Sequence, residues 1–125
     1  MDNIFTTSIH CMDGRIQEPI ISFVKEKYGC AYVDTITEPG PCKVLAGEEL
    51  TALHESIKNR ILISLEKHGS TMIFISGHHD CAGNPVSKEI QIEQIGKSAK
   101  YLQSQYPGAK VVQLWVDENW HVSKL

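Results

Sequence analysis

The sequence predicts an α/β fold in three layers, formed by one domain of residues 1–125. We expect a mostly parallel four-stranded sheet, an antiparallel strand at its C-terminal edge, and helices on both faces. Two observations lead to this prediction. Strand-like segments alternate with segments whose apolar residues recur at helical spacing, a pattern typical of parallel sheets. In addition, TMIFIS at residues 71–76 is almost entirely apolar, as expected of a central strand buried on both faces.

The first part of the chain supplies two strands and one helix. Residues 3–10 form a short β-prone stretch that includes IFTTSI, and CAYVDTI at 30–36 is typical of a second strand. Between them, residues 16–28 carry apolar side chains at helical spacing. Pro19 fits the first turn of this helix, and Gly29 is a natural end for it.

The second part of the chain supplies the remaining elements. TEPGPCKVLAG at 37–47 contains two prolines and two glycines, and we predict a long irregular loop there. A stripe of Leu and Ile residues predicts a helix over 48–68, and 86–105 has the pattern of another amphipathic helix. The segments 109–116 and 120–125 flank a polar turn and are predicted to form a hairpin.

The composition argues against several classes of protein. The net charge is −3 and no stripe of Lys and Arg is visible, so no nucleic-acid partner is expected. No apolar run approaches the roughly 18 residues of a membrane helix, and the first residues do not resemble a signal peptide. We therefore expect a cytoplasmic protein without a disulfide framework. The chain has four cysteines, at positions 11, 30, 42 and 81. Cys30 is expected in the core, and Cys42 is expected to be a free thiol on the loop surface.

Two polar clusters, CMDGR at 11–15 and GHHDC at 77–81, directly follow predicted strands. In an extended segment Cys11, Asp13 and Arg15 would project from the same face, because side chains alternate along a strand. The carboxyl ends of parallel strands meet at one edge of the sheet, where binding sites of open α/β sheets form. We therefore expect the two clusters to lie together.

Cys11, His78 and Cys81 offer a set of sulfur and imidazole donors that suits zinc. Three protein ligands with an open fourth position are typical of a catalytic zinc site. In the alternative without a metal, Cys11 is a buried thiol beside a surface ion pair of Asp13 and Arg15, and His78 and Cys81 belong to a structural turn. H-x-x-C alone is a weak signal, whereas its combination with C-x-D-x-R is a strong one.

CMDGR followed by GHHDCAGN resembles the β-class carbonic anhydrases, whose signature is C-x-D-x-R and then H-x-x-C. The C-terminal VVQLWVDENWHVSKL is similar to the closing hairpin of that family. The resemblance implies a zinc-dependent lyase that reversibly hydrates carbon dioxide to bicarbonate, with Cys11, His78 and Cys81 as metal ligands. It implies that Asp13 and Arg15 are catalytic, and that Asp13 ligates zinc only in a closed, inactive form. It also implies a homodimer or a higher homo-oligomer.

Two other functions stay open at this point. The segment 37–47 differs from the one that the family has after its second strand, so the electrophile could instead be carbon disulfide or carbonyl sulfide. A non-catalytic zinc-binding module is the other alternative, but a structural zinc does not need Asp13 and Arg15. His79 could relay protons, since histidine titrates near neutrality, or it could simply be a polar neighbour.

Overall fold

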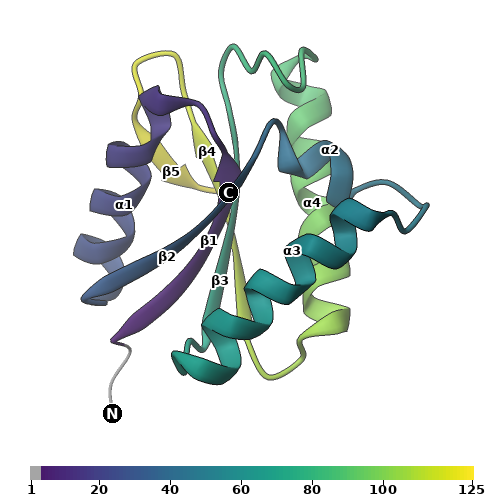
Figure 1. Cartoon of the computed structure of the whole chain (residues 1–125). Helices are drawn as coiled ribbons and strands as arrows, with labels where there is room; N and C mark the ends of the chain where they lie inside the picture. The colour runs from purple at the N-terminus through teal and green to yellow at the C-terminus, as the bar shows by residue number, and fades with distance from the viewer. Residues whose placement is uncertain (1–3) are drawn as a thin grey trace.

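The fold is built on one mixed sheet in the part of the chain that the computed structural model describes, residues 4–125 (Figure 1). The strands are β1 (Phe5–Cys11), β2 (Tyr32–Glu38), β3 (Met72–His78), β4 (Lys110–Val116) and β5 (Val122–Lys124). Their order in the sheet is β2-β1-β3-β4-β5; the first four are parallel and β5 is antiparallel to β4. This confirms the predicted sheet. Asn3, the first residue of the predicted first strand, lies outside the described residues.

Helices cover both faces of the sheet, as predicted. They are α1 (Gly14–Tyr28), α2 (Pro41–Leu45), α3 (Ala52–Leu62), a π-helical turn η1 (Ile63–Lys67) and α4 (Lys88–Gln105). Figure 1 shows α1 on one side of the sheet and α2, α3 and α4 on the other. The central strand β3 packs against both layers: Ile73 and Ile75 belong to the apolar cluster beneath α2–α4, and Phe74 belongs to the cluster beneath α1.

Helix α1 begins earlier than its apolar pattern predicts. Strand β1 ends at Cys11, and Asp13 caps the helix by accepting a hydrogen bond from the backbone N–H of Arg15. Pro19 therefore lies inside the helix and not in its first turn. The interpretation of residues 11, 13 and 15 as one face of an extended segment is wrong, because Asp13 and Arg15 belong to the start of a helix.

The segment 37–47 is more regular than predicted. Residues up to Glu38 continue β2, and Pro41–Leu45 form the short helix α2. Proline is well suited to the first helical position, where its missing N–H costs no hydrogen bond. The preceding Gly40 has φ 58°, a left-handed conformation that glycine adopts without strain, so the chain can turn sharply into α2.

The next helix is shorter than the predicted 48–68. Thr51 caps α3, and Leu50, which the apolar stripe would place in the helix, lies before it and is 73% exposed. The side chain of His54 completes the capping box, and His54 is buried. After Leu62 the helix continues as the π-helical turn η1.

The parallel registers bring the two polar clusters to the same edge of the sheet. β1 and β3 are neighbours, so Cys11 at the end of β1 and His78 at the end of β3 lie at one edge. The chain leaves β1 towards β2 on one side and later returns to β3 on the other side. This is the topological switch point at which ligands bind in open parallel sheets.

Candidate metal centre

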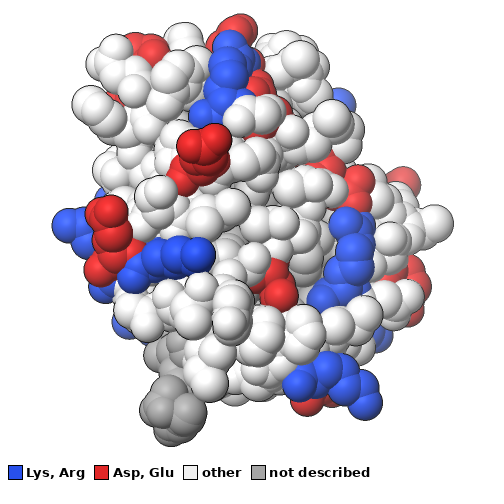
Figure 2. Space-filling view, turned by 60° about the vertical axis from the view of Figure 1, so that its left-hand side comes forward, with Lys and Arg blue, Asp and Glu red and all other residues white. Residues whose placement is uncertain are grey.

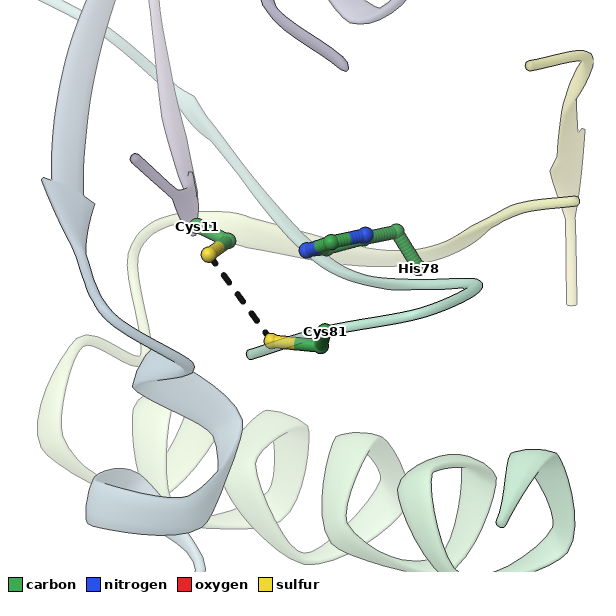
Figure 3. A group of neighbouring side chains, drawn as sticks. All are labelled: Cys11, His78 and Cys81. Carbon is green, nitrogen blue, oxygen red and sulfur yellow. Dashed lines mark hydrogen bonds between the residues drawn. The ribbon is translucent and has the colours of Figure 1, made fainter. Parts of the chain in front are cut away.

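Three side chains from two neighbouring strands converge at this switch point. Cys11 is the last residue of β1, His78 is the last residue of β3, and Cys81 follows in the turn after β3. All three are buried, and their ligand atoms lie within 4.8 Å of one another. Figure 3 shows the three side chains directed toward a common space. The predicted ligand set is thus brought together.

The spacing of the two sulfur atoms fits a metal ion. The Sγ atoms of Cys11 and Cys81 are 3.8 Å apart, and both cysteines are free thiols. Two thiolates bound to one tetrahedral zinc at about 2.3 Å would lie about 3.8 Å apart. The side chains therefore need little rearrangement to bind such an ion.

His78 presents one ring nitrogen for a metal. Its Nδ1 donates a hydrogen bond to the carbonyl oxygen of His79 (2.8 Å), which leaves the lone pair on Nε2. Nε2 is buried and has no hydrogen-bond partner among residues 4–125. Burial also lowers the pKa of His78, so the imidazole stays neutral, as a metal ligand must be. A buried nitrogen without a partner is costly, and a bound metal would satisfy it.

Without a bound cation, the neutral thiol form of Cys81 is favoured. Burial, and then the neighbouring Cys11, raise the pKa of Cys81, because two thiolates side by side in a buried site repel each other. A divalent metal between the sulfur atoms reverses this effect and binds both as thiolates. Two sulfurs and one imidazole suit zinc better than the hard cations Mg²⁺ and Ca²⁺, which prefer oxygen ligands. The residues present therefore fit zinc.

Asp13 and Arg15 form an ion pair beside this cluster. The Arg15 guanidinium donates to both carboxylate oxygens, from Nε to Oδ1 (3.0 Å) and from Nη2 to Oδ2 (2.7 Å). These hydrogen bonds lower the pKa of Asp13 to about 2, and the same contacts raise the pKa of Arg15. Asp13 is not among the residues whose ligand atoms cluster within 4.8 Å.

Arg15 contacts two further residues, Asp80 and Trp120, that the sequence did not predict as partners. Its Nη1 and Nη2 donate to the Asp80 carboxylate (3.3 Å) and carbonyl (3.1 Å). One face of the guanidinium lies over the ring of Trp120, 4.5 Å from the ring centre. The one sequence signal for Asp80 was its place between the two ligands of H-x-x-C.

The sequence also did not predict a chain of hydrogen bonds beside the group formed by Cys11, His78 and Cys81. His10 faces the opposite side of β1 from Cys11, and its ring bonds to Ser8 (2.9 Å) and to Oε1 of Gln17 (2.8 Å). The amide of Gln17 donates to the carbonyl oxygens of Cys11 (2.9 Å) and Asp13 (2.7 Å). This chain holds the backbone of the C-x-D motif between β1 and α1.

Cys42 is not the surface thiol that we expected. It is 2% exposed, and its Sγ donates to the carbonyl oxygen of Ser76 (3.1 Å). Burial raises its pKa to about 12, so it stays a thiol and not a thiolate ligand. Helix α2 buries Cys42 because Pro41, Cys42 and Leu45 face inward.

The space beside Cys11, His78 and Cys81 is very small, about 10 Å³. Gly40, Pro41, Cys42 and Ser76 line it together with the three cluster residues. A much larger depression of about 570 Å³ is lined by residues between 39 and 54 and by Gly83, and none of the three cluster residues lines it.

The comparisons with known proteins agree with this geometry. A family model described as "Putative carbonic anhydrase" matches residues 1–125. The chain belongs to this family. No curated protein matches its sequence. The resemblance that the C-x-D-x-R and H-x-x-C motifs indicated is therefore confirmed at the level of the family.

Solved structures similar to this carbonic anhydrase family member include β-carbonic anhydrases. A tetrameric enzyme from Sordaria macrospora has a TM-score of 0.66 at 12% identity, over 99% of this chain and 82% of its own. Isoform I from Trichomonas vaginalis has a TM-score of 0.60 at 18% identity, with 94% and 80% covered. CafA from Aspergillus fumigatus has a TM-score of 0.57 at 14% identity, with 98% and 74% covered. At these identities the likeness shows the fold alone.

Several other predictions for this family member can be checked. Cys30 lies in the core as expected, and the ring of His79 meets that of Trp120 edge-on, 6.4 Å between centres. Among residues 4–125, no helix has the length and apolarity needed to span a membrane. Basic and acidic side chains are interspersed on the face shown in Figure 2. That the protein binds no nucleic acid stays a prediction.

Proposed function

We propose that this family member is a zinc-dependent carbonic anhydrase that interconverts carbon dioxide and bicarbonate, as one β-carbonic-anhydrase-like domain over residues 1–125. One observation carries the proposal: the buried group of Cys11, His78 and Cys81 lies at the switch point of the sheet beside the Asp13–Arg15 ion pair. A structural zinc would need only the cluster. The adjacent carboxylate that is held by a guanidinium supports a catalytic role.

Sγ of Cys11, Nε2 of His78 and Sγ of Cys81 would hold the zinc. When bound, zinc lowers the pKa of a coordinated water from about 15.7 towards roughly 7, so that hydroxide becomes available near neutral pH. Two thiolates and a neutral imidazole leave little positive charge at the site, which by itself opposes this ionisation. The surrounding side chains therefore have to assist.

Asp13 would direct the reacting water. Its carboxylate, which Arg15 keeps ionised, can accept a hydrogen bond from the water and aim an oxygen lone pair at the carbon of carbon dioxide. We take the Arg15-paired arrangement to be the active one. In the resting form, Asp13 would leave Arg15 and act as a fourth metal ligand. Arg15 thus decides which of the two roles Asp13 has.

The packing beside the cluster leaves only about 10 Å³, room for at most about one water, so only the smallest substrates could approach a metal there. Gly40 and Gly83 leave no room for side chains, since a Cβ at Gly40 would lie 2.6 Å from Cβ of Asn84 and one at Gly83 would lie 2.7 Å from Pro39. Gly40 belongs to the segment 37–47, in which the sequence departs from the β-class pattern. Carbonyl sulfide and carbon disulfide, which are also linear and triatomic, are therefore the second candidate substrates.

We also propose that the protein is cytoplasmic and forms a homodimer or a higher homo-oligomer. Four free cysteines, all buried, support a reducing compartment. The Sordaria macrospora β-carbonic anhydrase is tetrameric, which supports assembly of a related chain. Size-exclusion chromatography with light scattering tests the second statement.

Metal content tests the site. Purified protein should contain about one zinc per chain, and Cys81→Ser should lose it. Cys30→Ser is the matched control, because Cys30 is also buried but lies outside the cluster, and this variant should keep its zinc. Correctly folded wild-type protein that binds no zinc when zinc is supplied would overturn the proposal.

Stopped-flow hydration of carbon dioxide tests the reaction. Zinc-loaded wild-type protein should exceed the buffer rate at alkaline pH, and Asp13→Ala should lose at least about 10²-fold, the usual contribution of a positioned acid–base group. The same assay with carbonyl sulfide and with carbon disulfide separates the candidate substrates. If zinc is present and none of the three reacts, the non-catalytic alternative is correct.

A further inference from the structure

Arg15 is held from three directions by residues of three different segments. The Asp13 carboxylate accepts from its Nε and Nη2, at the start of α1. Asp80, in the turn after β3, accepts at its carboxylate and at its carbonyl. Trp120, in the turn between β4 and β5, covers one face of the guanidinium at 4.5 Å. Arg15 therefore has several partners although its side chain is 45% exposed.

The backbone conformation of Trp120 indicates that its contact with Arg15 is functional. Trp120 has φ 61°, a left-handed conformation that is unusual for a large aromatic residue. Such conformations persist only where the surroundings fix them, and they concentrate at functional sites. Here Asp117 fixes the turn: its carboxylate accepts from the backbone of Asn119 and His121 (2.9 Å each), and its carbonyl accepts from Trp120 (2.9 Å).

Asp80 shows a similar arrangement in the turn that carries the candidate ligands. It has φ 57°, and it lies between His78 and Cys81. Aspartate tolerates the left-handed conformation better than most residues. This conformation turns the Asp80 carbonyl towards Nη2 of Arg15, while the carboxylate reaches Nη1. Arg15 therefore connects the metal-binding turn with the start of α1.

We infer that Trp120 and Asp80 are positioning residues. They hold the Arg15 guanidinium in the orientation in which it donates hydrogen bonds to both carboxylate oxygens of Asp13. This inference rests on the proposed function for its consequence but not for its geometry. With its face on Trp120 and its outer edge on Asp80, Arg15 can rotate away from Asp13 only by breaking all of these contacts. The hairpin β4–β5 thereby keeps Asp13 in the arrangement that orients water and away from the metal.

The geometric part can be tested on metal-free protein by ¹⁵N NMR of the arginine side chains. The chain has two arginines, Arg15 and Arg60, so only two Nε–H signals have to be assigned, and Arg60→Lys assigns them. Replacement of Trp120 by leucine removes the aromatic face. We expect Nε–H exchange of Arg15 to accelerate about fivefold, the factor that corresponds to the cation–π attraction at an exposed site. Arg60, bonded to Ser56 and Glu38, should not change.

Matched variants separate positioning from general destabilisation. Trp120→Phe keeps an aromatic face and should restore slow exchange at Arg15. Asp80→Asn tolerates the same backbone conformation and keeps the carbonyl contact, so it should accelerate exchange less than Trp120→Leu. Tyr32→Leu, which removes an exposed ring far from Arg15, should have no effect. Equal exchange of Arg15 in wild type, Trp120→Leu and Asp80→Asn would overturn the inference.

The consequence for the reaction is tested on Co²⁺-loaded and zinc-loaded protein. In Trp120→Leu we expect the visible Co²⁺ spectrum to shift as Asp13 becomes a ligand, and kcat to fall about fivefold with KM unchanged. Unchanged spectrum and kcat in a variant with fast Arg15 exchange would overturn the role of Trp120 in positioning Asp13. If no variant, wild type included, hydrates carbon dioxide, the proposed function fails while the NMR result still decides the geometry.

Discussion

The sulfur atoms of Cys11 and Cys81 lie 3.8 Å apart although 70 residues separate them in the sequence. No disulfide joins them, so the parallel pairing of β1 with β3 and the turn after β3 bring them together. Without a metal this arrangement is unfavourable, because it buries two thiols and an imidazole nitrogen with few partners. A metal bound at this site would therefore add its binding energy to the stability of the fold.

Metal removal should destabilise the protein. Since the three ligand groups are brought together only in the folded chain, zinc at about 1,000 times its Kd should stabilise it by about 4 kcal/mol. Urea denaturation with zinc and with a chelator measures this difference. In Cys11→Ala the two curves should coincide, whereas Cys30→Ala should keep the difference. A wild-type midpoint that does not respond to the chelator would contradict the prediction.

Cys42 should not be needed for metal binding. Its thiol donates to Ser76, and burial raises its pKa to about 12, so Cys42 stays a thiol and not a thiolate ligand. Cys42→Ser can keep the hydrogen bond and should retain one metal per chain. In native protein, maleimide should label Cys42 at least about 100-fold more slowly than in urea, which mass spectrometry of the peptides shows. Rapid labelling of native protein would mean that helix α2 opens readily.

Much of the fold and of the candidate site could be predicted because periodicity and strand order carry the information. The apolar run at β3 and the alternation with helices predict the sheet, and the parallel sheet then brings Cys11 and His78 to the same edge. The residues around Arg15 could not be predicted in this way. Their contacts depend on left-handed turns at Asp80 and Trp120, which no propensity favours at a tryptophan.

Two further features, the helix in 37–47 and the role of His10, were not predicted because each depends on where a helix begins. Proline and glycine in 37–47 favour a loop, but Pro41 begins a helix, since it occupies the first helical position after a turn at Gly40. His10 faces the opposite side of β1 from Cys11, and nothing in the sequence around it indicated a role at the site. Its role depends on Gln17, one turn into α1, and so on where that helix begins.

The buried ring of His10 should make stability depend on pH. Burial lowers its pKa from 6.5 to about 4, so the unfolded chain binds the proton first as pH falls. Its contribution to stability is therefore complete above about pH 6.5 and is lost as pH falls to about 4. The expected loss is about 3 kcal/mol.

The measurement compares urea unfolding of metal-free wild type and His10→Gln between pH 7 and pH 4. Carboxylates titrate in both proteins, so the difference between the two slopes reports His10. His121→Gln, which removes an exposed histidine, serves as the control for replacing a histidine by glutamine. Parallel slopes for wild type and His10→Gln would contradict the prediction.

Gly83→Ala should weaken both folding and metal binding. Gly83 packs against Pro39 so closely that a Cβ would lie 2.7 Å from two Pro39 atoms, the carbonyl carbon and Cβ. One of these atoms belongs to the backbone, so the segment before α2 would have to move, at a cost of about 1–3 kcal/mol. Because Gly83 lies two residues after Cys81, the displaced turn should also bind zinc less tightly, which competition with a chelator measures.

Gly108→Ala is the matched control for this substitution. A Cβ at Gly108 meets no atom within 4 Å, so its unfolding midpoint in urea should correspond to a change below about 0.5 kcal/mol, and its zinc affinity should be that of wild type. Loss of zinc affinity in Gly83→Ala with a normal midpoint would mean that the turn moves freely while Pro39 stays in place. Equal stability and equal zinc affinity in both variants would show that the wall formed by Pro39 and Gly83 does not constrain the metal-binding turn.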